Sequence, residues 1–225
     1  MRKIVFACFA ALAVTPAAAA DATHPTVIEL FQSQGCSSCP PANAALIEFA
    51  RRPEVLALNF SVDYWDRLGW KDTFAKPEFT QRQYAYSHAL GEGVYTPQIV
   101  VNGRVAGVGD TVAEMQSLAQ TTDRSGGVNL RIEANEAIVG AGKAPADGAD
   151  VWLVAYDPKV VDVAVARGEN SGRTLAHGAI VHGLVKLGQW RGVEARFSLP
   201  TQKPWSTAVL LQQSGAGPIL AAARE

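Results

Sequence analysis

Residues 26–49 read TVIELFQSQGCSSCPPANAALIEF, and this stretch of the 225-residue chain carries its strongest structural and chemical signals. The run Thr26–Phe31 is short, apolar and β-branched, which predicts a buried strand. From Pro40 to Arg51, apolar residues recur at helical spacing behind two prolines that suit a first turn, which predicts a helix. The pair Cys36 and Cys39 therefore lies between a strand and a helix.

Strand and helix patterns continue to alternate as far as residue 122. A second apolar strand is expected at Val55–Val62 and an amphipathic helix at Pro77–Leu90, which Gly91 is placed to end. Two further strands, Gln98–Val101 and Arg104–Val108, flank the hairpin signal Asn102-Gly103, and Asp110 is a candidate cap for a last helix. The predicted order of elements is β-α-β-α-β-β-α.

Beyond Ser125-Gly126-Gly127 the helical period disappears, and short strand-like runs separated by turn clusters replace it. Such spacing predicts an antiparallel sandwich. A short helix at Ala179–Leu187 is the one alternative to a strand in this half. The expected strands are Val128–Glu133, Ala137–Gly140, Val151–Asp157, Val160–Ala166, Ala179–Leu187, Glu194–Leu199, Thr207–Gln213 and Pro218–Ala223.

Composition and the N-terminal residues bound the compartment and the partners. The formal net charge of −1 gives no basic surplus for nucleic acid or an anionic membrane. Residues 1–20 combine two early positive charges, a short apolar run and small residues before Asp21, which is the layout of a signal peptide cleaved near Ala20. We therefore expect a periplasmic or secreted protein without stable membrane insertion, whose remaining cysteines are Cys36 and Cys39 in an oxidising compartment.

The spacing Cys36-Ser37-Ser38-Cys39 favours thiol–disulfide chemistry. A cysteine at a helix N-terminus has its thiolate stabilised by free N–H groups and the helix dipole, so Cys36 is the candidate nucleophile. Cys39, expected one turn into the helix, is close enough to form a disulfide with Cys36 and to resolve a mixed disulfide. A purely structural disulfide and a zinc site are the alternatives, although so small a ring constrains the unfolded chain little and zinc needs more ligands.

The order of elements, the CxxC motif and Thr96-Pro97 before the third strand resemble the thioredoxin superfamily. Longer strings resemble a family of secreted bacterial proteins catalogued as domain of unknown function 1223. They are GCSSCPP (35–41), VDYWDRLGWKD (62–72), VYTPQIVVNG (94–103) and GENSGRTL (168–175). The resemblance implies a cis peptide bond at Pro97 and a thioredoxin-like fold, but no established substrate. The chain departs from thioredoxins by having Gly35 before the first cysteine and Ser37-Ser38 between the pair.

Three other residues are candidates for the same site. Glu29 lies on the first strand and resembles the buried acid that assists the resolving cysteine in thioredoxins; a glutamate facing water is the alternative. Thr96 and Pro97 would present their backbone to a substrate peptide. Trp65 lies in an aromatic and acidic loop after the second strand, where it would either bind a substrate or pack its own loop.

These observations predict a signal peptide (1–20), an α/β thioredoxin-like domain (21–124) and an all-β sandwich-like domain (125–225). The predicted function is thiol–disulfide exchange with protein thiols or disulfides of the cell envelope. Catalysis falls to Cys36, Cys39 and Glu29, with no cofactor and no metal. The alternatives are a non-catalytic binding module with a structural disulfide and a copper-handling protein, although copper sites of this kind usually have CxxxC and a distal histidine.

Overall fold

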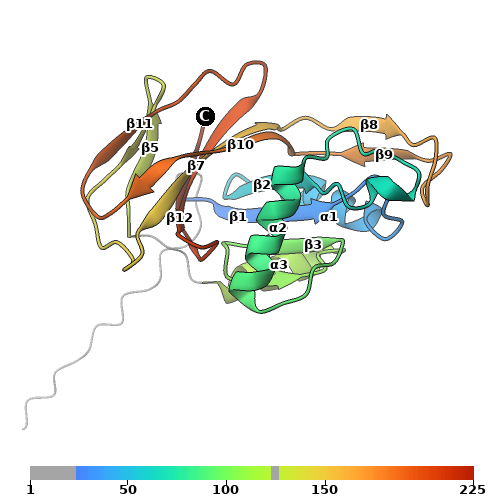
Figure 1. Cartoon of the computed structure of the whole chain (residues 1–225), viewed down its shortest axis with the longest axis horizontal. Helices are drawn as coiled ribbons and strands as arrows, with labels where there is room; N and C mark the ends of the chain where they lie inside the picture. The colour runs from blue at the N-terminus through green and yellow to red at the C-terminus, as the bar shows by residue number, and fades with distance from the viewer. Residues whose placement is uncertain (1–23, 123–126) are drawn as a thin grey trace, which may run out of the picture.

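The computed structural model describes residues 24–122 and 127–225 (Figure 1). The expected signal peptide and the expected domain boundary at residue 124 lie outside the described residues. The helices are α1 (Pro40–Phe49), α2 (Pro77–Leu90) and α3 (Val112–Thr121), with a 3-10 turn at Asp66–Leu68. The strands are β1 (Thr26–Gln32), β2 (Val55–Ser61), β3 (Gln98–Val101), β4 (Val105–Gly107), β5 (Leu130–Glu133), β6 (Glu136–Val139), β7 (Ala149–Asp157), β8 (Val161–Ala164), β9 (Thr174–His177), β10 (Ile180–Trp190), β11 (Ala195–Ser198), β12 (Ser206–Gln213) and β13 (Ile219–Arg224).

One mixed sheet of eight strands organises the molecule, in the order β13-β12-β7-β10-β2-β1-β3-β4. Strands β1 and β2 run parallel, as the crossover through α1 requires, and the β3–β4 hairpin continues the sheet antiparallel to β1. On the other side, β10 joins β2 in parallel through the pair Ile180 and Asn59. The strands of the second half therefore extend the sheet of the first half.

The predicted fold class is wrong on this point. We expected a thioredoxin-like α/β domain followed by a separate β-sandwich-like domain, whereas the structure is mostly sheet, with one eight-stranded sheet shared by both halves of the sequence. The physical reason is the free edge of β2, whose Asn59 N–H donates to the carbonyl of Ala179 at 2.8 Å. An unpaired edge presents N–H and C=O groups to any available strand, and the start of β10 pairs with this edge at Asn59.

Both faces of the sheet are covered, which accounts for three hydrophobic clusters. Helices α1 and α3 pack on one face around Ile28, Leu46 and Met115, while α2 crosses the other face through Phe79 and Tyr86 (Figure 1). A small sheet, β11-β6-β5, packs against the far part of the large sheet. Two sheets do face each other in the second half, but the larger one is the common sheet.

Local signals place most elements correctly. Asn102 and Gly103 form the turn between β3 and β4, with positive φ at both residues, and the Arg104 N–H closes the turn by donating to the Val101 carbonyl at 2.9 Å. Val101 pairs with Val105, so β4 begins one residue later than the expected Arg104. The cap of α3 is Thr111, one residue after the expected Asp110, because the Thr111 hydroxyl accepts the N–H of Glu114. Ala179–Leu187 falls almost wholly within strand β10 and forms no helix.

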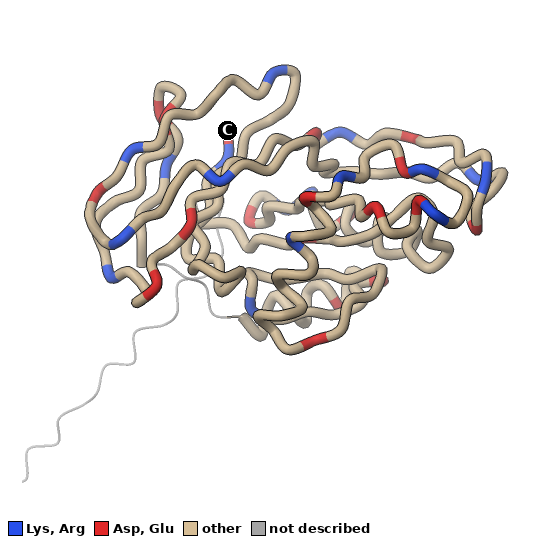
Figure 2. The backbone as a smooth tube through the Cα atoms, in the orientation of Figure 1, with Lys and Arg blue, Asp and Glu red and all other residues tan. Residues whose placement is uncertain are grey.

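Strand β9 was not expected, and it pairs with β8 in a two-stranded sheet at the end of the molecule opposite the β11-β6-β5 sheet (Figure 1). Lysine and arginine residues are intermixed with aspartate and glutamate residues over the backbone (Figure 2). Within residues 24–122 and 127–225, none of the helices combines the length and the apolar character needed to cross a bilayer.

Candidate functional site

The loop between β1 and α1 carries both cysteines and is built from tight turns. The Cys36 N–H donates to the carbonyl of Ser33 at 3.1 Å, and the Cys39 N–H donates to the carbonyl of Cys36 at 3.2 Å. Cys39 is the N-cap of α1, because Pro40 and Pro41 occupy the first helical positions. Cys36 therefore lies in the turn before the helix, and Cys39 lies at its start rather than one turn in.

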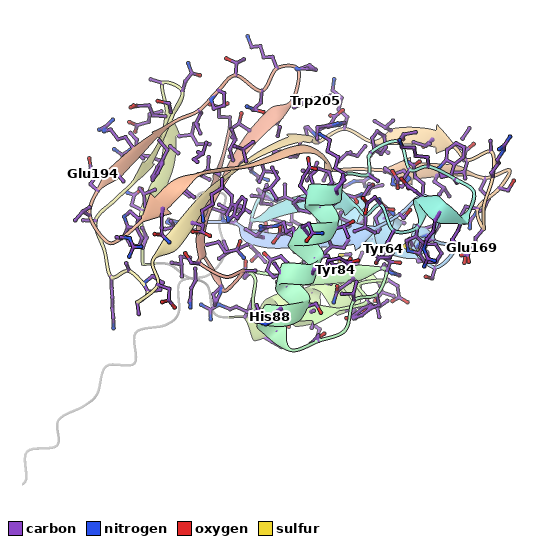
Figure 3. All side chains as sticks on the ribbon, viewed as in Figure 1. Tyr64, Tyr84, His88, Glu169, Glu194 and Trp205 are labelled. Carbon is purple, nitrogen blue, oxygen red and sulfur yellow. A yellow bond between two sulfur atoms is a disulfide. The ribbon has the colours of Figure 1, made fainter. Side chains whose placement is uncertain are left out.

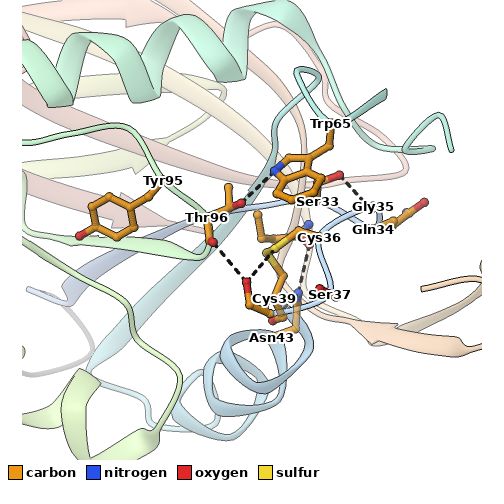
Figure 4. The surroundings of a disulfide bond; sticks show 12 residues. Ser33, Gln34, Gly35, Cys36, Ser37, Cys39, Asn43, Trp65, Tyr95 and Thr96 are labelled. Carbon is orange, nitrogen blue, oxygen red and sulfur yellow. Dashed lines mark hydrogen bonds between the residues drawn. A yellow bond between two sulfur atoms is a disulfide. The ribbon is translucent and has the colours of Figure 1, made fainter. Parts of the chain in front are cut away.

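Cys36 and Cys39 form a disulfide, with their Cα atoms 5.4 Å apart. Both cysteines are buried, with exposed fractions of 0 % and 1 %, while Ser37 and Ser38 between them are exposed. The Ser38 hydroxyl lies 3.3 Å from the Cys36 sulfur (Figure 4). The backbone of the motif thus reaches the surface, whereas an incoming group would meet the sulfurs only after a local opening.

Three predicted binding residues, Trp65, Thr96 and Pro97, lie beside this disulfide. The Thr96–Pro97 peptide bond is cis. The carbonyl oxygen of Thr96 accepts a 3.4 Å hydrogen bond from the Ser38 hydroxyl, and the indole N–H of Trp65 donates to the Thr96 hydroxyl at 2.9 Å (Figure 4). The structure therefore brings together three segments that the sequence separates by up to 58 residues.

The loop after β2 forms hydrogen bonds to Gln34, in the loop that carries the cysteines. The N–H of Gln34 donates to Asp72 Oδ2 at 2.7 Å, and the indole N–H of Trp70 donates to Gln34 Oε1 at 2.9 Å. Burial raises the pKa of Asp72, and the hydrogen bonds from Gln34 and Phe74 act in the opposite direction. Trp70 and Asp72, both in the string 62–72, therefore hold Gln34, which lies two residues before Cys36.

Glu29 lies away from the disulfide. Its neighbours along β1, Val27 and Phe31, pack in the cluster on the α2 face, whereas α1 and its cysteine cap lie on the opposite face. The carboxylate accepts a 2.6 Å hydrogen bond from Arg82 Nε and another from the Tyr86 hydroxyl. The structure thus gives Glu29 a cationic partner on α2 and does not bring it to Cys39.

The side chains next to Cys39 are neutral amides. Asn43, one turn into α1, donates to Gln32 Oε1 at 3.1 Å and accepts from Asn59 Nδ2 at 2.7 Å. Gln32 donates in turn to the Ser61 hydroxyl at 2.8 Å. These hydrogen bonds link the buried groups in a chain, although Asn59 Oδ1 has no partner among the described residues. Amides and hydroxyls do not titrate in the ordinary range, so this group offers Cys39 no acid or base.

Two functional candidates that the sequence did not single out come from the second half of the chain. Asn170 donates from Nδ2 to the carbonyl oxygens of Gln34 and Cys36, at 3.0 and 2.9 Å. Glu169 accepts the N–H of Ser37 at 3.1 Å through Oε2. The only available signal was their place in the string 168–175, which shows resemblance but assigns no contact.

Among the described residues, no group of three histidine, cysteine, aspartate or glutamate side chains is arranged to hold a metal ion. His177 is buried on β9 with both ring nitrogens unpaired, and burial lowers its pKa to about 4. The nearest aromatic contact of His177 is Phe74, with ring centroids 6.0 Å apart. The histidine thus packs as a neutral ring.

The fold and the site define a mostly-sheet protein that carries a disulfide within the loop between β1 and α1. The chain belongs to the family described as protein of unknown function (DUF1223), whose model matches residues 27–212. No curated protein matches the chain.

Two solved structures are similar to this one. A crystal structure of a protein from Agrobacterium tumefaciens is 33 % identical, with a TM-score of 0.74, over 92 % of this chain and 95 % of that one. HBP35 of Porphyromonas gingivalis is 16 % identical, with a TM-score of 0.59, over 90 % of this chain and 75 % of that one. At that identity the second likeness concerns the fold alone.

Proposed function

We propose that this protein is an exported thiol–disulfide oxidoreductase that uses the Cys36–Cys39 disulfide. The observation that carries the proposal is the position of the disulfide between the end of β1 and the start of α1, beside the cis Thr96–Pro97 bond. This arrangement resembles the exchange site of thioredoxin-like oxidoreductases, although the sheet around it is larger. The proposed substrates are thiols and disulfides of cell-envelope proteins, reached after cleavage near Ala20.

The reaction is a two-electron exchange in which the substrate is the redox partner. A substrate thiolate attacks Cys36 Sγ, the bond between the two protein sulfurs breaks, and Cys39 leaves as a thiolate that takes up a proton. The second substrate thiolate attacks the substrate sulfur of the mixed disulfide and releases Cys36. The substrate dithiol thereby loses two electrons and two protons to the protein, and the reverse sequence reduces a substrate disulfide.

Thr96 and Pro97 are the proposed contacts for the substrate backbone, and Trp65 lines the same side. The Thr96 carbonyl is held by Ser38 only at 3.4 Å, a long hydrogen bond that a substrate N–H would readily replace. Glu29 has no part in this mechanism, because its carboxylate is paired with Arg82. Proton transfer to Cys39 then falls to water or to the substrate thiol.

The test is to equilibrate the purified exported protein across glutathione redox buffers and to count alkylated thiols by mass. A midpoint between about −120 and −270 mV, with exchange lost in Cys36→Ser, would support the proposal. Cys39→Ser should accumulate a mixed disulfide on Cys36, since the resolving thiol is absent. Full exchange activity in Cys36→Ser would contradict it.

The burial of both sulfurs favours a second function, a binding module that keeps the disulfide as a structural bond. The same titration separates the two, since structural disulfides stay closed below about −300 mV. A closed disulfide at that potential, with no exchange on protein thiols, would support the binding module.

A further inference from the structure

The connection between β8 and β9, residues 165–173, lies across the cysteine loop, and we call it the β8–β9 strap. Asn170 fastens the strap, because its amide donates to the carbonyls of Gln34 and Cys36 on either side of Gly35. Asn170 is fully buried although the residues around it in the strap are exposed. One side chain, 134 residues away in sequence, therefore holds the backbone of Cys36.

The strap is itself held in one shape. Arg173 donates to Asn170 Oδ1 at 2.6 Å, which fixes the amide so that both N–H groups point at the cysteine loop. The N–H of Gly172 donates to the carbonyl of Val165 at 2.8 Å, and the Ser171 hydroxyl donates to the carbonyl of Ala166 at 3.1 Å. Glu169, the residue before Asn170, is thereby held next to the cysteine loop.

Glu169 places its carboxylate on the residue that follows Cys36. Its Oε2 accepts the N–H of Ser37 at 3.1 Å, and hydrogen bonds from Ser37 lower the pKa of Glu169. Glu169 is therefore ionised at neutral pH. Figure 3 shows it at the end of the molecule that also carries Tyr64, at the opposite end from Glu194.

We propose that Glu169, held in place by Asn170, opposes the Cys36 thiolate and thereby makes the disulfide harder to reduce. This inference deepens the proposed function and rests on it. The N–H groups before α1 would otherwise stabilise a thiolate on Cys36. One of them, the N–H of Ser37, instead donates to the Glu169 carboxylate. Glu169 is a positioning residue, because it acts on Cys36 through Ser37 and through its charge.

The sign of the effect follows from the charges of the two redox states. The disulfide is neutral, whereas the reduced form carries a thiolate that a nearby carboxylate destabilises. Destabilising the reduced form shifts the equilibrium toward the disulfide. Other charged side chains also form hydrogen bonds in this region. Asp72 accepts from the Gln34 N–H, Asp66 accepts from the Asp72 N–H, and Arg173 donates to Asn170 Oδ1. Positive and negative residues both lie at this end of the molecule (Figure 2).

The experiment compares Glu169→Gln with the wild type. The amide keeps an oxygen for the Ser37 N–H and removes the charge. We expect Cys36 of the reduced variant to react with iodoacetamide at pH 6 about three- to tenfold faster, because more of it is thiolate. We also expect the equilibrium constant for reduction by dithiothreitol to rise, by up to a similar factor at a pH where the reduced protein carries the Cys36 thiolate. Both gains should shrink in 1 M salt, because Glu169 is exposed and its charge is screened.

Glu194→Gln is the matched control, since Glu194 is an exposed glutamate at the other end of the molecule (Figure 3). It should leave the alkylation profile and the equilibrium unchanged. A second comparison measures Glu169→Gln in an Asn170→Ala background, where the charge is no longer held on Ser37 and the gain should be smaller.

An unchanged pH profile of alkylation in Glu169→Gln, or a slower reaction, would overturn the inference. So would an equal gain in the Asn170→Ala background, because the strap would then have no part in placing the charge. These ratios between variants are measurable with dithiothreitol even where protein thiols do not exchange. Failure of the proposed function is therefore distinguishable from failure of this inference.

Discussion

Glu29 and Arg82 form an ion pair in the interior, with Arg82 Nε 2.6 Å from Glu29 Oε1 and side-chain exposures of 0 % and 4 %. Tyr86 completes the Glu29 site from the same helix, and Gln212 on β12 accepts from Arg82 Nη2 at 3.2 Å. Arg82 on α2 thus contacts both Glu29 on β1 and Gln212 on β12. These contacts connect the first half of the sequence to the second on the face of the sheet that α2 covers.

Glu29→Gln should strongly destabilise the fold, because it leaves the Arg82 guanidinium buried without a counter-charge. Breaking such a pair costs about 3–5 kcal/mol of the free energy of unfolding, measured by urea denaturation. The double variant Glu29→Gln with Arg82→Met should recover part of that loss, since no buried charge remains. The control is Glu133→Gln, which breaks the exposed pair with Arg131 and should cost under about 1 kcal/mol. Equal losses at the two sites would contradict the prediction.

The sequence indicated that Glu29 lies in an apolar strand, but it did not indicate a partner. Helical spacing identifies α2 as an amphipathic helix, and yet Arg82 reads as an ordinary charged residue on it. Only the packing of α2 across β1 brings the two side chains together over a separation of 53 residues. A resemblance in position to a catalytic acid therefore did not place Glu29 at the cysteines.

The order of strands in the sheet could not be predicted from local sequence patterns either, because it depends on residues that are far apart in sequence. Periodicity finds β7, β10 and β12, but the joint between β2 and β10 depends on one pair, Ile180 and Asn59, which are far apart in sequence. Strand β9 was not predicted because it is only four residues long, too short for its alternation of exposed and buried positions to stand out as a period. By contrast, the CxxC loop, the first helix and the Asn102-Gly103 hairpin carry their signals in adjacent residues, and these were predicted.

Gly103→Ala tests how closely the β3–β4 turn meets the second half of the chain. Gly103 has φ +63°, and a Cβ there would lie 2.6 Å from the carbonyl oxygen of Gly217. We expect a loss of about 2–4 kcal/mol, from the left-handed backbone and from the collision. Gly91→Ala is the control, because Gly91 has φ +67° with open space around it and should cost only about 1 kcal/mol. Urea midpoints that fall equally would show that the contact with Gly217 is unimportant.

His177 predicts a specific loss of stability in acid. Burial lowers its pKa to about 4, and the charge of Asp162 acts in the opposite direction. Between pH 6.5 and 4 the unfolded chain therefore binds a proton at His177 that the folded chain does not, so stability falls as the pH is lowered through this window. The contribution is on the order of 3 kcal/mol.

His177→Leu should remove this contribution, since neither ring nitrogen has a hydrogen-bond partner among the described residues. The free energy of unfolding, measured by urea denaturation at pH 7 and pH 4.5, should fall less in the variant than in the wild type. His88→Gln, at an exposed position on α2, should retain the wild-type acid sensitivity. An identical acid loss in His177→Leu would contradict the assignment to His177.

Trp65 predicts how fast a small reductant reaches the buried sulfurs. A Cβ on Gly35 would lie 3.4 Å from Trp65 Cβ, and the indole N–H holds the Thr96 hydroxyl at 2.9 Å, so the ring bridges the cysteine loop and the segment before Pro97. Trp65→Ala should expose the sulfurs on this side and raise the rate of reduction by dithiothreitol several-fold. The rate is measured by quenching samples over time and alkylating the free thiols. Trp65→Phe keeps an aromatic ring and loses only the hydrogen bond, so it should stay close to the wild-type rate. If Trp65→Ala is reduced no faster than Trp65→Phe, access to the sulfurs does not depend on this ring, and the prediction is contradicted.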